Sequence, residues 1–303
     1  MENKAPLNNR YEFVLLYDVE NGNPNGDPDA GNMPRIDPET GYGIVTDVCL
    51  KRKIRNYIEL VKGGEAPYKI YVTEGIPLNT QHRQAYINTG ITLPEKAKNA
   101  PADDLLTVRQ WMCDNFYDVR TFGAVMTTGV NCGQVRGPVQ LNFSRSIDPI
   151  IQQEVTITRV TVTQEEAGKT TEMGRKHIVP YGLYRMEGYV SANLANKAIS
   201  LKSKPNQTSY FTGFSEEDLE LLWQAMMNMF EFDHSASRGK MSSRKLFVFK
   251  HDNALGNAHA QDLFDLIEVA RKNPAEVARS FDDYVVSVNH SAVPEGVTLI
   301  ERL

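Results

Sequence analysis

The chain has 303 residues, of which 41% are hydrophobic, so it can bury a large core as one elaborated domain or two small ones. Its formal charge of −5 at pH 7 and its pI near 5.8 argue against a protein coated in nucleic acid. An average charge does not exclude one basic groove on an acidic body, so local charge is the more informative quantity.

The three cysteines, Cys49, Cys113 and Cys132, show no metal-binding spacing and are odd in number, which indicates reduced thiols in a cytosol. The chain has no run of about eighteen apolar residues. Residues 1–10 also lack the apolar stretch of a signal peptide. We therefore expect a cytoplasmic protein with no membrane partner, no metal and no cofactor.

Residues 11–19 predict an apolar strand, since β-branched and aromatic side chains dominate them. The residues that follow are rich in Asn, Gly, Pro and Asp, which favour turns. Their glycines permit positive φ and their prolines fix φ. We expect a shaped loop whose backbone amides are free to point at a ligand.

This loop leads into a predicted helix with Thr46 as its N-cap. Lys51, Arg52 and Arg55 fall off the apolar stripe of that helix, and residues 46–62 hold five Lys or Arg against two Asp or Glu, a local charge of +3. A glycine-rich turn that feeds a basic helix suits phosphate. The stripe itself consists of Leu50, Ile54, Tyr57, Ile58 and Val61.

Three other interpretations of the loop remain open. The spacing of Asn21, Asn23, Asn25 and Gly26 imitates the start of a calcium loop, although the leading Asp and the bidentate Glu are missing. Asp27 and Asp29 could instead hold a catalytic magnesium ion, since magnesium suits phosphodiester cleavage. The third alternative is a solvated surface loop.

Residues 63–118 have the character of an insertion, with a predicted helix over residues 103–117. We expect Trp111 to pack in the core, and His82 and Arg83 to lie on the surface. The segment RTFGAVM at 120–126 partly imitates the RNA-contacting strand of an RRM, but the other aromatic positions of that motif are absent. We therefore interpret Phe122 as a packing residue.

Residues 133–147 predict a strand in which Gln134, Arg136 and Arg145 interrupt the apolar positions. The alternating pattern from Val155, a polar stretch, and the return through residues 182–194 predict a long hairpin. Its tip has too few large apolar residues to pack on the body, so the hairpin should project.

The last third of the chain contains a polar linker, an amphipathic helix and a second basic segment. The linker carries Lys197, Lys202 and Lys204, and the helix begins at the cap Ser215. Residues 238–250 hold five Lys or Arg and no acid, a charge of +5. Two basic segments, each beside a predicted strand, favour one phosphate track. Beyond them we expect a helix over 261–272, a short helix after Pro274 and a strand over 284–288.

Several stretches together resemble the backbone-subunit family (the Cas seven family) of the type I, subtype C, CRISPR Cascade surveillance complex. They are NGNPNGDPDAGNMPR from residue 21, RTFGAVM, GQVRGPVQLNFSRSIDPI from residue 133, GLYRMEGYVSANLA from residue 182 and SASRGKMSSRKLFVFKHD from residue 235. The resemblance implies an α+β fold with a modified RRM or ferredoxin-like palm and an antiparallel sheet. It places the palm at 1–62, 119–149 and 182–303, helical fingers at 63–118 and a hairpin thumb at 150–181.

The same resemblance implies a non-catalytic protein that binds crRNA by its phosphates and leaves the bases free to pair with target DNA. Its partners would be the crRNA, further copies of itself in a helical filament and other Cascade subunits in a prokaryotic cytoplasm. Met173, Arg175 and Lys176 would form the wedge of the thumb. The expected RNA-binding residues are Asn21, Asn23, Asn25, Gly26, Lys51, Arg52, Arg55, Gln134, Arg136, Arg145, Arg238, Lys240, Met241, Ser242 and Arg244.

The rival hypothesis is an RNase, because the backbone subunits of type III effectors resemble this plan and cleave target RNA. Asp27 or Asp29 would then hold the metal. The sequence offers no nearby His and no paired acid motif in support of it.

Overall fold

An antiparallel sheet forms the centre of the computed structural model, which describes residues 5–93, 101–163, 168, 170–196 and 211–303. The strand order is β14-β11-β1-β10-β8-β4, and β7 and β9 also pair with β10. The strands are β1 (Tyr11–Gly22), β4 (Tyr42–Val45), β7 (Val139–Leu141), β8 (Ser144–Pro149), β9 (Gln153–Arg159), β10 (Glu172–Val190), β11 (Lys240–His251) and β14 (Val297–Glu301).

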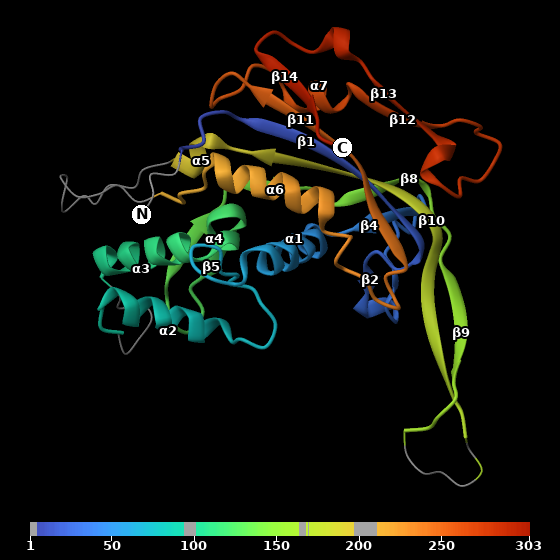
Figure 1. The fold of residues 1–303 in the computed structure, drawn as a ribbon, viewed down its shortest axis with the longest axis horizontal. Coiled ribbons are helices and arrows are strands. Elements are labelled where there is room, and N and C mark those ends of the chain that lie inside the picture. The colour runs from blue at the N-terminus through green and yellow to red at the C-terminus, as the bar shows by residue number, and fades with distance from the viewer. Residues whose placement is uncertain (1–4, 94–100, 164–167, 169, 197–210) are drawn as a thin grey trace.

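Helices cover one face of this sheet and a small sheet with a short helix covers the other (Figure 1). The helices are α1 (Asp47–Lys62), α2 (Leu78–Thr89), α3 (Ala102–Asn115), α4 (Tyr117–Phe122), α5 (Ala192–Asn196), α6 (Glu216–Asn228) and α7 (Ala260–Phe264). The two-stranded sheets are β2 (Gly26–Asp27) with β3 (Met33–Pro34), β5 (Gly123–Met126) with β6 (Gly133–Arg136), and β12 (Ile267–Arg271) with β13 (Tyr284–Val288). This mixture of helices and antiparallel strands confirms the predicted α+β class.

Strand β1 is apolar almost throughout because both of its faces are covered. Its odd-numbered side chains, such as Phe13 and Tyr17, belong to the core under α1 and α6, whereas Val14 and Leu16 belong to a second core under α7, β12 and β13. Phe13 lies over the opposing Gly188, where an added Cβ would come within 2.3 Å of its ring. The strand therefore shows no polar alternation, although the sheet is antiparallel.

Helix α6 begins at the predicted cap. The Ser215 side chain accepts from the Asp218 backbone N–H, and the Asp218 carboxylate accepts from the Ser215 N–H, which forms a capping box. Trp223 of this helix packs edge-on against Phe13, with 5.0 Å between the ring centres. The predicted apolar face of the helix therefore fastens it to the centre of the sheet.

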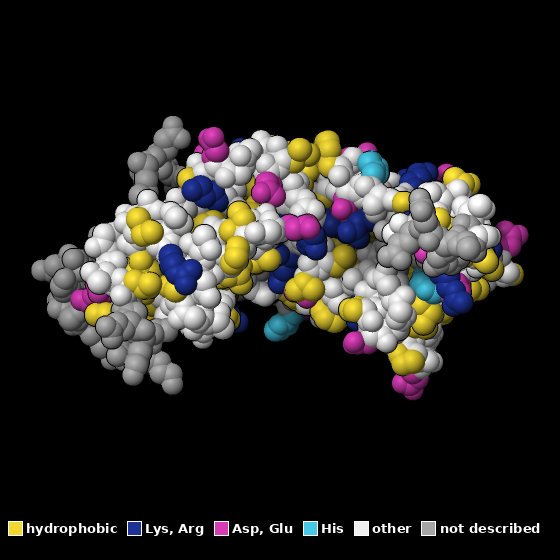
Figure 2. All heavy atoms as spheres, turned by 90° about the horizontal axis from the view of Figure 1, so that it is seen from below, with side chains coloured by type: hydrophobic (Ala, Val, Ile, Leu, Met, Phe, Trp, Pro, Cys, Tyr) yellow, Lys and Arg dark blue, Asp and Glu magenta, His cyan; other side chains and the backbone are white. Residues whose placement is uncertain are grey.

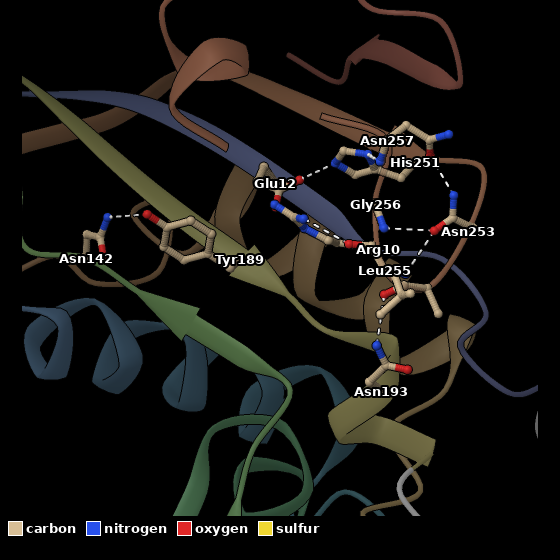
Figure 3. Close-up of polar contacts among 11 residues, drawn as sticks. Arg10, Glu12, Asn142, Tyr189, Asn193, His251, Asn253, Leu255, Gly256 and Asn257 are labelled. Atoms are coloured by element: carbon tan, nitrogen blue, oxygen red, sulfur yellow. Dashed lines mark hydrogen bonds and ion pairs between the residues drawn. The ribbon is translucent and has the colours of Figure 1, made fainter. Parts of the chain in front are cut away.

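A buried ionic network joins the beginning of β1 to the end of β11 (Figure 3). Glu12 and His251 are fully buried, and His251 Nε2 lies 2.6 Å from Glu12 Oε2. His251 Nδ1 accepts from the Asn257 backbone N–H, so Nε2 carries the proton and donates to Glu12. Arg10 provides the second partner of Glu12 at 2.5 Å. The buried charge of Glu12 is therefore not left unpaired.

Strands β9 and β10 form the predicted long hairpin, which projects from the body (Figure 1). Their register runs from the pair Glu172 and Arg159 to the pair Ile178 and Gln153. Most of the β9 side chains are exposed, whereas the far half of β10 is a buried central strand of the main sheet. One strand thus belongs to both the body and the projection.

Helices α2 and α3 have a hydrophobic cluster of their own, which includes Tyr86, Val108 and Met112. The prediction that His82 lies on the surface is wrong, because His82 is fully buried and its Nε2 lies 2.7 Å from the Tyr71 hydroxyl. Trp111 is half-buried and packs against this cluster, edge-on to Phe116. Arg83 is exposed, as expected.

Three predicted elements differ from the observed ones. Helix α7 ends at Phe264, and the residues after it form strand β12, so the helix predicted over 261–272 is wrong. The strand predicted over 133–147 is divided into β6, β7 and β8, with Pro138 between the first two. The segment 120–126 starts as the end of α4, and Phe122 is buried, which agrees with its packing role.

The strand predicted over 284–288 coincides with β13, and β14 follows it. The residues after Pro274 form no α-helix, and two 3₁₀ turns cover Phe281–Asp283 and His290–Ala292. Lys197, Lys202 and Lys204 lie outside the described residues. Within the described ranges, no helix has the length and apolar character needed to cross a membrane.

Candidate nucleic-acid interface

The glycine-rich loop is fastened to the beginning of α1 by one amide side chain. Asn25 Oδ1 accepts from both the backbone N–H and the hydroxyl of Thr46, each at 3.0 Å. Thr46 is the N-cap of α1 by its backbone conformation, but its hydroxyl is directed to Asn25 and makes no capping bond. Asn25 therefore fixes how the loop enters the helix.

Other predicted loop residues also stabilise the loop itself. Asn23 is buried, donates to the Asn32 carbonyl at 2.7 Å, and its backbone N–H donates to the carbonyl of Ser237. An added Cβ on Gly26 would meet the Asn32 side chain at 1.9 Å, so glycine is needed for this close approach. Asn21 is exposed and adopts a positive φ of 51° at the end of β1. Of the three asparagines Asn21, Asn23 and Asn25, only Asn21 is exposed.

The acids of the loop hold its conformation. Asp27 Oδ1 accepts from the Asp29 backbone N–H at 3.1 Å, and its Oδ2 lies 3.4 Å from Arg35. Asp27 thereby caps the 3₁₀ turn Pro28–Ala30. In the described part of the chain, no group of three or more His, Cys, Asp or Glu side chains is placed to hold a metal ion.

The two basic segments meet at the carboxylate of Asp233. Lys53 of α1 forms an ion pair with Asp233 Oδ2, and Arg238 Nε lies 2.7 Å from the same oxygen in a second ion pair. The backbone of the turn is joined to the loop through Asn23 and Ser237. We name the area formed by α1, the loop 21–25 and the turn 233–238 the helix–turn surface.

Three further cations of α1 have acidic partners as well. Lys51 pairs with Asp47 at 2.7 Å, and the exposed Arg52 pairs with Glu74 at 3.1 Å. Arg55 is largely buried and donates to Asp118 at 2.8 Å. Arg55 is therefore engaged in the structure of the protein, and its side chain is not freely available to a phosphate.

Strand β11 divides the second basic segment between the two faces of the sheet. Met241 is 5% exposed in the core under α6, so it does not present its side chain to a ligand. Lys240 pairs with Glu20, and Arg244 pairs with Asp18, on the opposite face. Ser242, which opposes Asp18 in the register, is half-buried.

Asp18, a buried residue near the end of β1, is the partner of Arg244. Asp18 Oδ2 accepts from Arg244 Nε at 2.9 Å and from the Tyr181 hydroxyl at 3.1 Å. Burial raises the pKa of Asp18, and Arg244 and Tyr181 oppose that rise by favouring the ionised carboxylate. Arg244 therefore compensates a buried charge and is not a freely exposed cation.

Three further predicted residues lie apart from the helix–turn surface. Arg145 of β8 pairs with Asp37 at 2.7 Å and lies over the Tyr42 ring. Gln134 and Arg136 of β6 are exposed and line a cleft of about 720 Å³ beside α3. Phe122 also lines this cleft, and its ring centre is 5.5 Å from both Lys51 Nζ and the Arg55 guanidinium.

The predicted wedge residues point to different sides of the hairpin. Met173 is 77% exposed, and Arg175 is exposed and lies 3.3 Å from Glu154. Lys176, one residue further, donates to the Ala236 carbonyl at 2.8 Å. The root of the hairpin is thus attached to the helix–turn surface, while Met173 lies nearer the tip.

Positive and negative side chains lie together in the middle of the face shown in Figure 2. The helix–turn surface shows the same pattern in detail, because Lys51, Arg52, Lys53 and Arg238 each have a carboxylate partner. Burial also lowers the pKa of the Lys53 ammonium. Asp233 lies 180 residues after Lys53, so no local pattern predicts that pair, whereas Asp47 lies one helical turn before Lys51. Arg109 of α3, which lines the cleft, was not predicted because a single arginine in a helix carries no motif.

The fold and this surface define a mixed helix and antiparallel-sheet protein with an interface rich in paired cations. The model of the family described as CRISPR-associated protein Cas7 matches residues 9–289. The chain therefore belongs to the CRISPR-associated Cas7 family. This confirms the predicted family, while type I, subtype C, stays a prediction.

A curated relative named CRISPR-associated protein Cas7, from Haloferax volcanii, is 29% identical over 322 residues that span 97% of this chain and 84% of the relative. One similar solved structure is titled "CRISPR RNA-guided surveillance complex, pre-nicking". It has a TM-score of 0.47 and 13% identity over 79% of this chain and 78% of that one. Another, titled "CRISPR RNA-guided surveillance complex", has a TM-score of 0.40 and 14% identity over 78% and 68%.

Proposed function

We propose that this chain is a non-catalytic backbone subunit of a type I-C surveillance complex, which binds the guide part of a crRNA along the helix–turn surface. A guide has to work with any sequence, so its carrier should contact phosphates and leave the base edges free. Family membership supports this proposal, and so does the chemistry of the surface.

The observation that carries the proposal is the meeting of two distant basic segments at Asp233. Lys53 and Arg238 are 185 residues apart in the sequence, yet both form an ion pair with Asp233 Oδ2. Backbone amides and hydroxyl groups of the loop and of Ser235 and Ser237 lie in the same area. Such a mixture of cations, amides and hydroxyls is typical of phosphate contacts.

Phosphate binding here involves an exchange of partners. Arg52 and Glu74 are both exposed, so a phosphate can replace this carboxylate at little cost. Lys53 is 1% exposed and Arg55 is largely buried, so both remain with their acids. Lys51 is 14% exposed and pairs with Asp47, so it is no more available than Arg55. We therefore assign direct contact to Arg52 and Arg238, and a supporting role to Lys51, Lys53 and Arg55.

The other parts of the chain fit the same proposal. The main sheet with α1 and α6 would form the palm, residues 63–118 the fingers and the projecting hairpin at 150–181 the thumb. Copies of the subunit would follow one another head to tail along the RNA, since a heterologous contact that does not close gives a filament. Target DNA would then pair with the exposed bases of the guide, in the cytoplasm of a prokaryote.

Asp27 and Asp29 take part in loop geometry under this proposal. Asp27 caps the turn and pairs with Arg35, and the exposed Asp29 contributes its backbone N–H to that cap. The variants Asp27→Ala and Asp29→Ala should therefore keep RNA binding.

The experiment is a comparison of binding with cleavage. The purified protein is mixed with labelled guide RNA, then with complementary RNA or DNA and magnesium. We expect a stable complex and intact strands. Cleavage that is lost in Asp27→Ala or Asp29→Ala would show that the protein is an enzyme. Failure to bind any guide would contradict the binding function itself.

A further inference from the structure

The cleft beside α3 differs chemically from the helix–turn surface. It is lined by residues of α3, of the β5–β6 hairpin and of the chain at Phe211, with a volume of about 720 Å³. This lies in the range of sites for small ligands. Gly123 and Gly137 allow the walls to approach closely, because an added Cβ on either would come within 2.5 Å of backbone atoms.

Two guanidinium groups line this cleft without acidic partners. Within the described ranges, the side chains of Arg109 and Arg136 make no hydrogen bond and no ion pair. Arg109 is half-buried, and burial lowers its pKa, as expected for a cation with no compensating charge. A half-buried guanidinium with unused donors favours an anion as its missing partner.

The remaining lining groups suit a nucleotide. The Phe211 ring is 44% exposed at the cleft and can stack on a base, and Phe122 contributes a second aromatic wall. Gln134 is exposed at the same cleft, where its amide can donate to or accept from a base edge. Arginine beside an exposed aromatic ring, here Phe211, is the combination that binds single-stranded nucleic acid.

We propose that this cleft is a second nucleic-acid site, which binds a short stretch of single-stranded nucleic acid other than the guide. Phosphates bind to Arg109 and Arg136, and a base stacks on Phe211. Phe122 lines the cleft and also contacts Lys51 and Arg55 of α1. The nucleic acid in the cleft therefore runs close to the helix–turn surface.

The test measures the binding of a short fluorescein-labelled oligothymidylate to the full chain in the presence of saturating guide RNA. We expect Arg109→Gln with Arg136→Gln to weaken binding about tenfold or more and to lower the salt slope by about 1.4, or ~0.7 for each lost phosphate contact. Phe211→Ala should weaken binding about tenfold with an unchanged salt slope. Arg83→Gln, an exposed arginine of α2 outside the cleft, is the matched control and should change nothing.

Arg136→Gln is also measured alone, since Arg136 is exposed and its replacement should leave folding intact. Binding of the guide RNA is measured separately from binding of the oligothymidylate. If the proposed function is wrong, guide binding fails, whereas oligothymidylate binding tests only the cleft. Unchanged probe binding in all cleft variants would overturn the second site. Loss of self-association with unchanged probe binding would also overturn it, because the cleft would then bind a protein segment.

Discussion

The helix–turn surface and the α3 cleft both carry arginines, but their electrostatic states differ. At the helix–turn surface Lys51, Arg52, Lys53 and Arg238 each have a carboxylate partner, and Lys53 is held by Asp233 at 1% exposure. At the cleft, Arg109 and Arg136 have no such partner within the described ranges. The number of basic residues in a stretch of sequence therefore does not give the charge that a ligand meets. What decides it is where the acids lie after folding.

The largest effect should follow from breaking the buried pair. Asp233→Ala leaves Lys53 uncompensated in the core, and we expect the free energy of unfolding to fall by about 3–5 kcal/mol. Urea denaturation measures this loss. Glu74→Ala, which breaks the exposed pair with Arg52, is the control and should change stability by no more than ~0.5 kcal/mol. If Asp233→Ala and Glu74→Ala lowered the free energy of unfolding equally, the proposed difference between buried and exposed ion pairs would be wrong.

A smaller loss is expected from Arg55→Ala. It leaves Asp118, which is 1% exposed, with only the backbone N–H donors of Tyr71 and Val72. We expect a loss of about 2–3 kcal/mol, because an unpaired buried charge retains part of its hydrogen bonding. Arg52→Ala on the same helix serves as the control and should leave the urea midpoint nearly unchanged. A stable Arg55→Ala protein with weakened RNA binding would instead place Arg55 in direct contact with phosphate.

Much of the fold follows from local sequence patterns. The strand from Tyr11, the helix from Thr46, the cap Ser215 and the long hairpin are set by periodicity and capping, which neighbouring residues determine. The helix predicted over 261–272 fails because its apolar spacing also fits a short helix followed by strand β12. Tertiary packing chooses between these alternatives.

The candidate site could be predicted only in part. The basic segments and the glycine-rich loop are visible in the sequence, and the structure joins them through Asn23, Asn25 and Asp233. The direction of each side chain along β11 depends on register, which sends Met241 into the core and Arg244 to the other face. The partners of Lys53 and Arg244 lie 180 and 226 residues away, so no local pattern predicts these two pairs.

The buried histidine provides a test by pH. Burial lowers the pKa of His82, so the folded protein keeps it neutral while the unfolded chain takes up a proton below about pH 6.5. Stability should therefore fall as the pH drops below that value. We expect the urea midpoint of His82→Gln to change less between about pH 7.5 and ~5.5 than that of the original protein. An identical pH response in both proteins would show that His82 titrates normally.

The smallest effect on stability should come from the hairpin. Met173→Asp changes a side chain that is 77% exposed, so the free energy of unfolding should stay within about 0.5 kcal/mol of the original. If the hairpin is the thumb, this variant should still disturb the spacing of subunits along RNA. Mass photometry of the assembled complex measures that spacing. Normal assembly would argue against Met173 as the wedge.

The central claim is that the helix–turn surface binds guide RNA through phosphates without reading its sequence. The most direct measurement is the salt dependence of binding for two guides of unrelated sequence, with the original protein and with Arg52→Ala and Arg238→Ala. Each variant should lower the salt slope by roughly one unit, equally for both guides. Lys240→Ala, on the opposite face of the sheet, should change the slope less. Unchanged slopes in the Arg52 and Arg238 variants, or a loss confined to one guide, would contradict the account.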